Sequence, residues 1–296
     1  MSTPDSNPVA GGQPPAPEPA SVTAPAPKQS RAGRNLPAAV GSAIVLLGGI
    51  ATSLFFWKAG FMIIVVAAVV VAVWELGQAF ASREIRLVRE PLLVGGVAIV
   101  VSAYVFGTPS MGTATAVTVL AAMLWRLRGG VAGYVRDVTA TAFTVFYVPF
   151  LGAFVALMLA EPDGALAIVT FILVTIASDI GGYAAGVLFG KHPMAPVISP
   201  KKSWEGFAGS TVSCVLVGFA TVVYLLDGTW WVGVLLGLIA VVTATLGDLC
   251  ESVIKRDLGI KDMSQIIPGH GGLMDRLDSL LATAAPTYLL LHYLVF

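Results

Sequence analysis

Acidic residues near the end of the chain have a spacing suited to holding a divalent cation. Asp275 and Asp278 are three residues apart, and Asp248 closes the apolar segment that precedes them. Residues three apart share one face of a helix, so two adjoining helices could bring the three carboxylates to one point. Carboxylate oxygens suit Mg²⁺ rather than zinc or copper, and substrate phosphates can complete its coordination. We therefore expect Mg²⁺, and leave a second cation open, at Asp248, Asp275 and Asp278.

The segment between these acids is rich in groups that bind phosphate. Gly271 and Gly272 permit a positive φ and a close backbone approach, and a helix that begins near Gly272 favours an anion at its first turn. The other polar candidates of this segment are Ser252, Lys255, Arg256, Lys261, His270 and Arg276. An ion-pair network between the same acids and the arginines is the structural alternative.

A second polar loop, 190–206, carries further candidates. Lys201 and Lys202 could bind phosphate as point charges. Ser199 stands before a proline, which indicates a turn or a helix start, and Glu205 closes the loop. The alternative is a basic loop that only orients the protein in a membrane.

Two more acids lie inside apolar segments. Asp179 stands among small residues, and because a charge at mid-bilayer costs at least ~2.5 kcal/mol, it needs a cavity or a partner. Glu75 lies near the end of its segment, and we expect it to be an interfacial acid.

The elements that must position these residues are membrane-spanning helices. Of 296 residues 56% are hydrophobic and 11% are charged, which excludes a soluble globular enzyme and a disordered protein. The 17 basic and 17 acidic residues balance, so we expect no nucleic-acid partner. We predict an all-α polytopic membrane protein with nine spans: 37–56, 60–80, 91–107, 111–125, 138–160, 164–189, 207–226, 229–249 and 273–295.

The basic residues orient this bundle. All of the 17 Lys and Arg except Lys58 fall in connections on one side, which the positive-inside rule assigns to the cytoplasm. The N-terminus is then cytoplasmic and the C-terminus outside, with the candidate site facing the cytoplasm. Residues 1–36 are rich in Pro and Ala, which predicts a disordered tail before a membrane domain at 37–296. Its catalytic part is expected in about 170–296.

Residues 252–278 resemble the signature of the phosphatidate cytidylyltransferase family, also called CDP-diacylglycerol synthases. The matching positions are Ser252, Lys255, Arg256, Lys261, Asp262, Pro268, His270, Gly271, Gly272, Asp275, Arg276 and Asp278. The stretch 199–206 is also similar to a family motif. Ile180 departs from the family, which often has a hydroxyl residue after the acid at this position.

The resemblance implies that CTP and phosphatidic acid react to CDP-diacylglycerol and pyrophosphate with Mg²⁺. It implies a homodimer. We expect the inner (plasma) membrane, and the Ala-, Val- and Gly-rich spans with the Pro/Ala-rich tail indicate a bacterium of high genomic GC content. Asp248 and Asp275 would be the primary metal ligands and Asp278 a further one. The residues that would bind substrate or act in catalysis are Asp179, Ser199, Lys201, Lys202, Glu205, Ser252, Lys255, Arg256, Lys261, His270, Gly271, Gly272 and Arg276.

Other functions stay open at this point. A CDP-archaeol-type synthase or a CTP-dependent polyprenol kinase would differ only in its lipid, which apolar spans do not encode legibly. A secondary transporter with acids as proton relays is a more distant alternative. The motif of the CDP-alcohol phosphotransferases is absent from the sequence.

Overall fold

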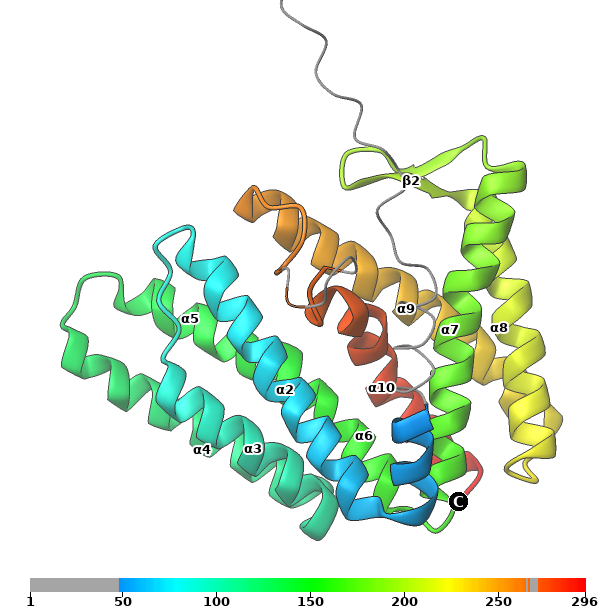
Figure 1. Cartoon of the computed structure of the whole chain (residues 1–296), viewed down its shortest axis with the longest axis horizontal. Coiled ribbons are helices and arrows are strands. Elements are labelled where there is room, and N and C mark those ends of the chain that lie inside the picture. Colours follow the sequence, from blue (N-terminus) through cyan, green and yellow to red (C-terminus); the bar gives the residue numbers. More distant parts are fainter. Residues whose placement is uncertain (1–47, 265, 267–270) are drawn as a thin grey trace, which may run out of the picture.

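The computed structural model describes residues 48–264, 266 and 271–296, and it is a bundle of helices (Figure 1). The predictions for the tail at 1–36 and for His270 lie outside these residues. The first part of the bundle contains α2 (Lys58–Ala81), α3 (Arg89–Phe106), α4 (Thr108–Arg126), η2 (Leu127–Gly129), α5 (Tyr134–Val145), η3 (Phe146–Phe150) and α6 (Leu151–Ala160). The second part contains α7 (Gly164–Phe189), β1 (Pro193–Ala195), β2 (Ser199–Ser203), α8 (Trp204–Tyr224), α9 (Trp230–Leu258) and α10 (Met274–Leu294).

Seven helical stretches in the described part of the chain are long and apolar enough to cross a membrane. They comprise α2, α3, α4 with η2, the continuous run from α5 through η3 to α6, and α7, α8 and α9. The polytopic helical class predicted from the sequence is therefore confirmed. α10 has 21 residues but is not among the seven, and the first predicted span is described only from residue 48, where 48–56 are helical.

The connection between α7 and α8 adds a short two-stranded hairpin to the predicted all-α bundle. β1 and β2 pair antiparallel, with Pro193 opposite Ser203, and project from the end of the bundle (Figure 1). Proline is disfavoured in a helix interior and biases the residue before it toward extended backbone. Pro193, Pro196 and Pro200 therefore favour a hairpin where the sequence suggested only a loop.

The C-terminal end of α9 corrects a second boundary. The helix does not stop at the end of the apolar run but continues to Leu258, so Ser252, Lys255 and Arg256 lie on a helix rather than in a loop. Charged residues interrupt the apolar segment, but they are compatible with a helix. Basic residues in the last turn also interact favourably with the helix dipole. Gly259, with φ +70°, makes the left-handed cap that terminates α9.

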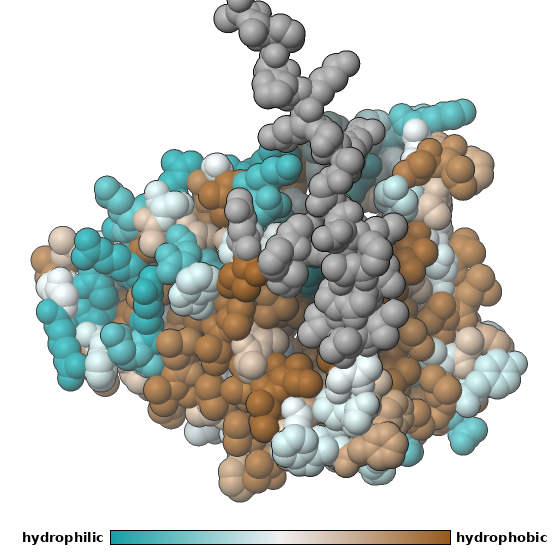
Figure 2. Space-filling view, in the orientation of Figure 1, coloured by the Kyte–Doolittle hydropathy of each residue, from teal (hydrophilic) through white to brown (hydrophobic). Residues whose placement is uncertain are grey.

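Hydrophobic side chains cover the lower part of the face in Figure 2, and hydrophilic ones gather along its upper and left margins. The hairpin lies at the upper margin, and α9 ends in the upper half of the same view (Figure 1). Such a division is typical of a bundle with an apolar belt and a polar end. The candidate residues are thus at the polar end.

Candidate active site

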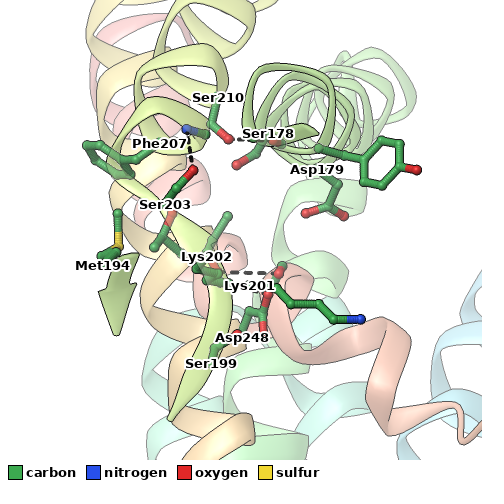
Figure 3. A pocket seen from close by; sticks show the side chains of 17 residues that line it. Ser178, Asp179, Met194, Ser199, Lys201, Lys202, Ser203, Phe207, Ser210 and Asp248 are labelled. Carbon is green, nitrogen blue, oxygen red and sulfur yellow. Dashed lines mark hydrogen bonds and ion pairs between the residues drawn. The ribbon is translucent and has the colours of Figure 1, made fainter. Parts of the chain in front are cut away.

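A cavity of about 330 Å³ lies between α7, α8, α9 and β2 at the polar end of the bundle. Asp179 of α7 and Asp248 of α9 point into it, and Lys201 and Lys202 of β2 line it with Ser199 (Figure 3). All five were predicted from the sequence. The tertiary structure brings two acids and two bases that are up to about 70 residues apart in the chain into one hollow.

Lys202 and Asp248 form an ion pair across this cavity. The distance from Lys202 Nζ to Asp248 Oδ2 is 2.7 Å, and the two side chains are 24% and 37% exposed (Figure 3). Asp248 Oδ1 also accepts a hydrogen bond of 3.3 Å from the hydroxyl of Ser252, one turn further along α9. Both side chains are reachable from water, so each can exchange its present partner for a ligand.

Small residues bring α7 and α8 close enough to form the walls of the cavity. A Cβ on Gly182 would lie 2.5 Å from Ser210 Oγ, and one on Gly206 would lie 3.0 Å from the carbonyl of Gly182. The Ser210 hydroxyl donates to the carbonyl of Ser178 at 2.6 Å. Close approach of this kind needs small residues at both helix surfaces.

The start of α8 is fixed by a side-chain cap. Ser203 accepts a hydrogen bond of 3.1 Å from the N–H of Gly206, so the residue after Lys202 is both the end of β2 and the N-cap of α8. Glu205 accepts hydrogen bonds from the N–H groups of Lys191 and His192, at 3.1 and 3.2 Å. Glu205 therefore holds the hairpin to the helix and does not line the cavity.

Asp275 is the centre of a second cluster, at the junction of α9 and α10. Its Oδ1 lies 2.8 Å from Lys255 Nζ, and its Oδ2 accepts from the N–H of Gly272 at 2.9 Å and of Met263 at 3.0 Å. Lys255 also lies 2.6 Å from Glu251 of the same helix, whose carboxylate is buried. The cluster ties the first turn of α10 to the last turns of α9.

The remaining predicted residues surround these two clusters. Arg256 donates to the carbonyl of Ile198 at 3.3 Å and so connects α9 to the hairpin. Gly271 adopts φ +84°, which confirms the expected left-handed backbone. Asp278 is buried in the first turns of α10, whereas Lys261 and Arg276 are exposed.

The chain matches the cytidylyltransferase family over residues 37–294. It belongs to that family. It is 41% identical over 280 residues to the phosphatidate cytidylyltransferase of Mycobacterium leprae, covering 89% of this chain and 90% of the relative. It is 42% identical over 285 residues to that of Mycobacterium bovis (91% and 92%). The protein of that name from Helicobacter pylori is 34% identical over 194 residues (66% and 70%). The family expected from residues 252–278 is confirmed.

Enzymes that transfer phosphoryl groups from nucleoside triphosphates commonly use Mg²⁺, which carboxylates could hold. Among the described residues, no three His, Cys, Asp or Glu side chains form a group that could hold a metal ion. Asp248, Asp275 and Asp278 thus do not meet as expected, because Asp275 turns to Lys255. Mg²⁺ usually takes one or two carboxylates, with waters and substrate phosphates. Asp179 and Asp248, on one cavity, fit that set; the metal roles of Asp275 and Asp278 stay predictions.

Several residues of this cytidylyltransferase site were missed in the sequence. Ser178, Ser203 and Ser210 line the cavity, and Glu251 completes the Lys255 cluster. Small residues recur every fourth position in α7 and α8, as at 178, 182 and 186 and at 206, 210 and 214, which could have indicated the close pair. Glu251 stands four residues before Lys255, a spacing that pairs the two side chains on a helix, but the end of the apolar run before it predicts a loop here.

Proposed function

We propose that the chain transfers the cytidylyl group of CTP to phosphatidic acid, forming CDP-diacylglycerol and pyrophosphate. The observation that carries this proposal is the cavity where Asp179 and Asp248 face Lys201 and Lys202 at the polar end of a membrane bundle. A lipid in the bilayer and a nucleotide in water can meet only at such a boundary. Family membership and the names of the relatives support the same reaction.

The chemical step is an in-line displacement at phosphorus. An oxygen of the phosphatidate headgroup forms a bond to the α-phosphorus of CTP, and the bond from that phosphorus to the bridging oxygen breaks with release of pyrophosphate. The nucleophile is already an anion, so no strong general base is needed. The main obstacle is the repulsion between two polyanions, which positive groups must offset.

Different residues in and around the cavity would bind the phosphates, the metal ion and the lipid headgroup. Lys201 and Lys202 neutralise the phosphates of CTP, and Lys202 exchanges Asp248 for a phosphate when the nucleotide enters. Asp248 and Asp179 are the carboxylates that would hold Mg²⁺ in the cavity; the sequence predicts Asp275 as a primary ligand beside Asp248 and Asp278 as a further one. Bound Mg²⁺ supplies positive charge to the triphosphate and to the departing pyrophosphate. Ser199 and Ser252 offer hydroxyl groups, and Arg256 and Arg276 attract the phosphatidate headgroup.

The proposed setting is the inner (plasma) membrane of a bacterium. The protein would cross it nine times, with the N-terminus and the active site in the cytoplasm and the C-terminus outside, and would act as a homodimer without nucleic acid. The distribution of Lys and Arg supports this orientation. A reporter fused to the C-terminus that is active in the cytoplasm would contradict it.

The reaction is tested with the purified protein in detergent micelles, labelled CTP and phosphatidic acid, with and without Mg²⁺. The expected products are CDP-diacylglycerol and pyrophosphate in equal amounts, and only when Mg²⁺ is present. Release of CDP with a phosphorylated lipid would instead identify a kinase. Formation of a CDP-lipid with a different lipid acceptor, and none with phosphatidic acid, would contradict the proposed substrate.

A further inference from the structure

Glu75 lies in α2, the first of the seven candidate membrane helices, and its carboxylate caps the N-terminus of α10. Its side chain is fully buried, with 0% of its surface exposed. Oε1 accepts the N–H of Leu273 at 2.8 Å, and Oε2 accepts the N–H of Met274 at 2.6 Å. The side chain does not extend to water, as expected of an interfacial acid, but lies at the start of α10, about 200 residues away in the chain.

These contacts are those that a helix start requires. The first N–H groups of a helix have no partner within it, and the helix dipole favours a negative charge at that end. Leu273, the residue at the N-cap of α10, provides no side-chain cap of its own. A carboxylate supplied by α2 fills this place.

Glu75 also holds the chain just before the junction. The hydroxyl of Ser264 donates to Oε1 at 2.5 Å, so one carboxylate oxygen binds both Ser264 and Leu273. Asp275 also connects the same two segments, because its Oδ2 accepts hydrogen bonds from the N–H groups of Met263 and Gly272. The two carboxylates thus link residues 263–264, which follow α9, to residues 272–274, where α10 begins.

Gly272 lies next to the carboxylates of both Glu75 and Asp275. A Cβ at this position would be 2.9 Å from Asp275 Oδ2 and 3.0 Å from both oxygens of Glu75. Both carboxylates therefore lie close to the backbone of Gly272, and backbone N–H groups and Lys255 compensate their like charge. Any displacement of Glu75 must shift the first turn of α10.

We infer that Glu75 is a positioning residue for the cytidylyl transfer: through the N-terminus of α10 it sets where Asp275 and Arg276 stand relative to α9. The inference rests on the proposed function, because it assigns Glu75 to that site. It gives the N-terminal half of the chain a part in catalysis although none of the predicted site residues lies there.

The test compares Glu75→Gln, Glu75→Asp and Ser264→Ala with the unaltered protein in micelles. The glutamine keeps the size but has one amide NH₂ group that cannot accept, so at least one N–H of α10 loses its partner. We expect kcat per folded molecule to fall roughly tenfold or more, and the Mg²⁺ concentration for half-maximal rate to rise. Ser264→Ala should shift both values in the same direction but less, and Glu75→Asp should recover part of the loss.

The matched control is Glu90→Gln, which changes an exposed glutamate in α3 and should leave both values unchanged. A purely structural role would lower the amount of folded protein but would not change the Mg²⁺ dependence of the protein that remains folded.

Hydrogen exchange at the amides of Leu273 and Met274 reports on the helix cap without turnover and should become faster in Glu75→Gln. Unchanged kcat and Mg²⁺ dependence in Glu75→Gln would overturn the inference.

If Glu75→Gln fails to fold, Ser264→Ala and Glu75→Asp decide: wild-type values in both would overturn the inference. An unaltered protein that forms no CDP-diacylglycerol would contradict the proposed function instead. The exchange rates at Leu273 and Met274 would still show whether Glu75 caps α10.

Discussion

Lys202 of the hairpin and Asp248 of α9 pair at 2.7 Å across the cavity that the proposed function assigns to CTP. Neither side chain is buried, so the pair is a surface contact that contributes little to stability, typically ~0–1 kcal/mol. The pair matters because both side chains line the cavity. Under the proposed function, Lys202 would bind the phosphates and Asp248 the metal ion, and the nucleotide would separate the two side chains on entering.

Lys202→Ala should weaken CTP binding. Loss of a charged contact to phosphate is expected to lower kcat/KM for CTP by about tenfold to a hundredfold. The unfolding temperature should change little, because the lysine is partly exposed. Steady-state rates against CTP concentration measure the effect. Lys191→Ala is the control, since Lys191 is an exposed lysine of the same connection; an equal loss in both variants would indicate a general effect of charge.

Asp248→Asn should remove activity, because the neutral amide is a poor ligand for Mg²⁺ and no longer orients Lys202. We expect a loss of about a hundredfold or more that extra Mg²⁺ does not restore. The rate of CDP-diacylglycerol formation across a Mg²⁺ titration measures it. Asp257→Asn, on an exposed residue of the same helix, should behave as the unaltered protein. Full activity of Asp248→Asn would contradict the assignment.

Asp275→Asn should abolish product formation while the protein still inserts into the membrane. The change leaves Lys255 without one of its two carboxylates and weakens the acceptor for the N–H groups of Gly272 and Met263. It also removes the charge expected of a metal ligand. Product formation and a membrane-fraction blot measure the two outcomes. Near-normal turnover at ordinary Mg²⁺ would show that Asp275 is neither a ligand nor a necessary contact.

Gly237→Ala should destabilise the bundle rather than the chemistry. A Cβ at this position would lie 2.5 Å from the carbonyl of Cys214 and 2.6 Å from the Cα of Val215, so α8 and α9 must separate. Overpacking of this kind costs about 1–3 kcal/mol. Thermal unfolding in detergent measures the loss. Gly112→Ala in α4 is the control, because nothing lies within 4 Å of its added Cβ; an equal loss there would contradict the packing explanation.

The apolar segments of the sequence predicted where the described helices lie, but not all of their ends. The segment 164–189 agrees in both ends with α7, and the fourth segment, 111–125, lies within α4. The end of α9 lies nine residues beyond the predicted 249. The count of nine spans stays a prediction, because the described residues supply seven that satisfy length and hydropathy together. Hydropathy is a local property, and a local property can be read along a chain.

The site was predicted in part for the same reason. The signature at 252–278 identified the family, and the structure places Asp179, Asp248, Lys201 and Lys202, each a candidate from the sequence, around one cavity. The sequence did not show that Asp275 faces Lys255 rather than Asp248, since that depends on how α10 is rotated against α9. Nor did the spacing of charges reveal that α9 continues to Leu258.

The sequence by itself determined a helical membrane protein, its family and the residues with charge at its polar end. Only the tertiary structure decided which charges meet: Lys202 with Asp248, Lys255 with Asp275, and Glu75 with the first turn of α10. The physical reason is the range of the interactions. Burial in lipid acts on each segment separately, whereas an ion pair or a helix cap forms only when close packing has fixed the rotation and depth of two segments that may be distant in the chain.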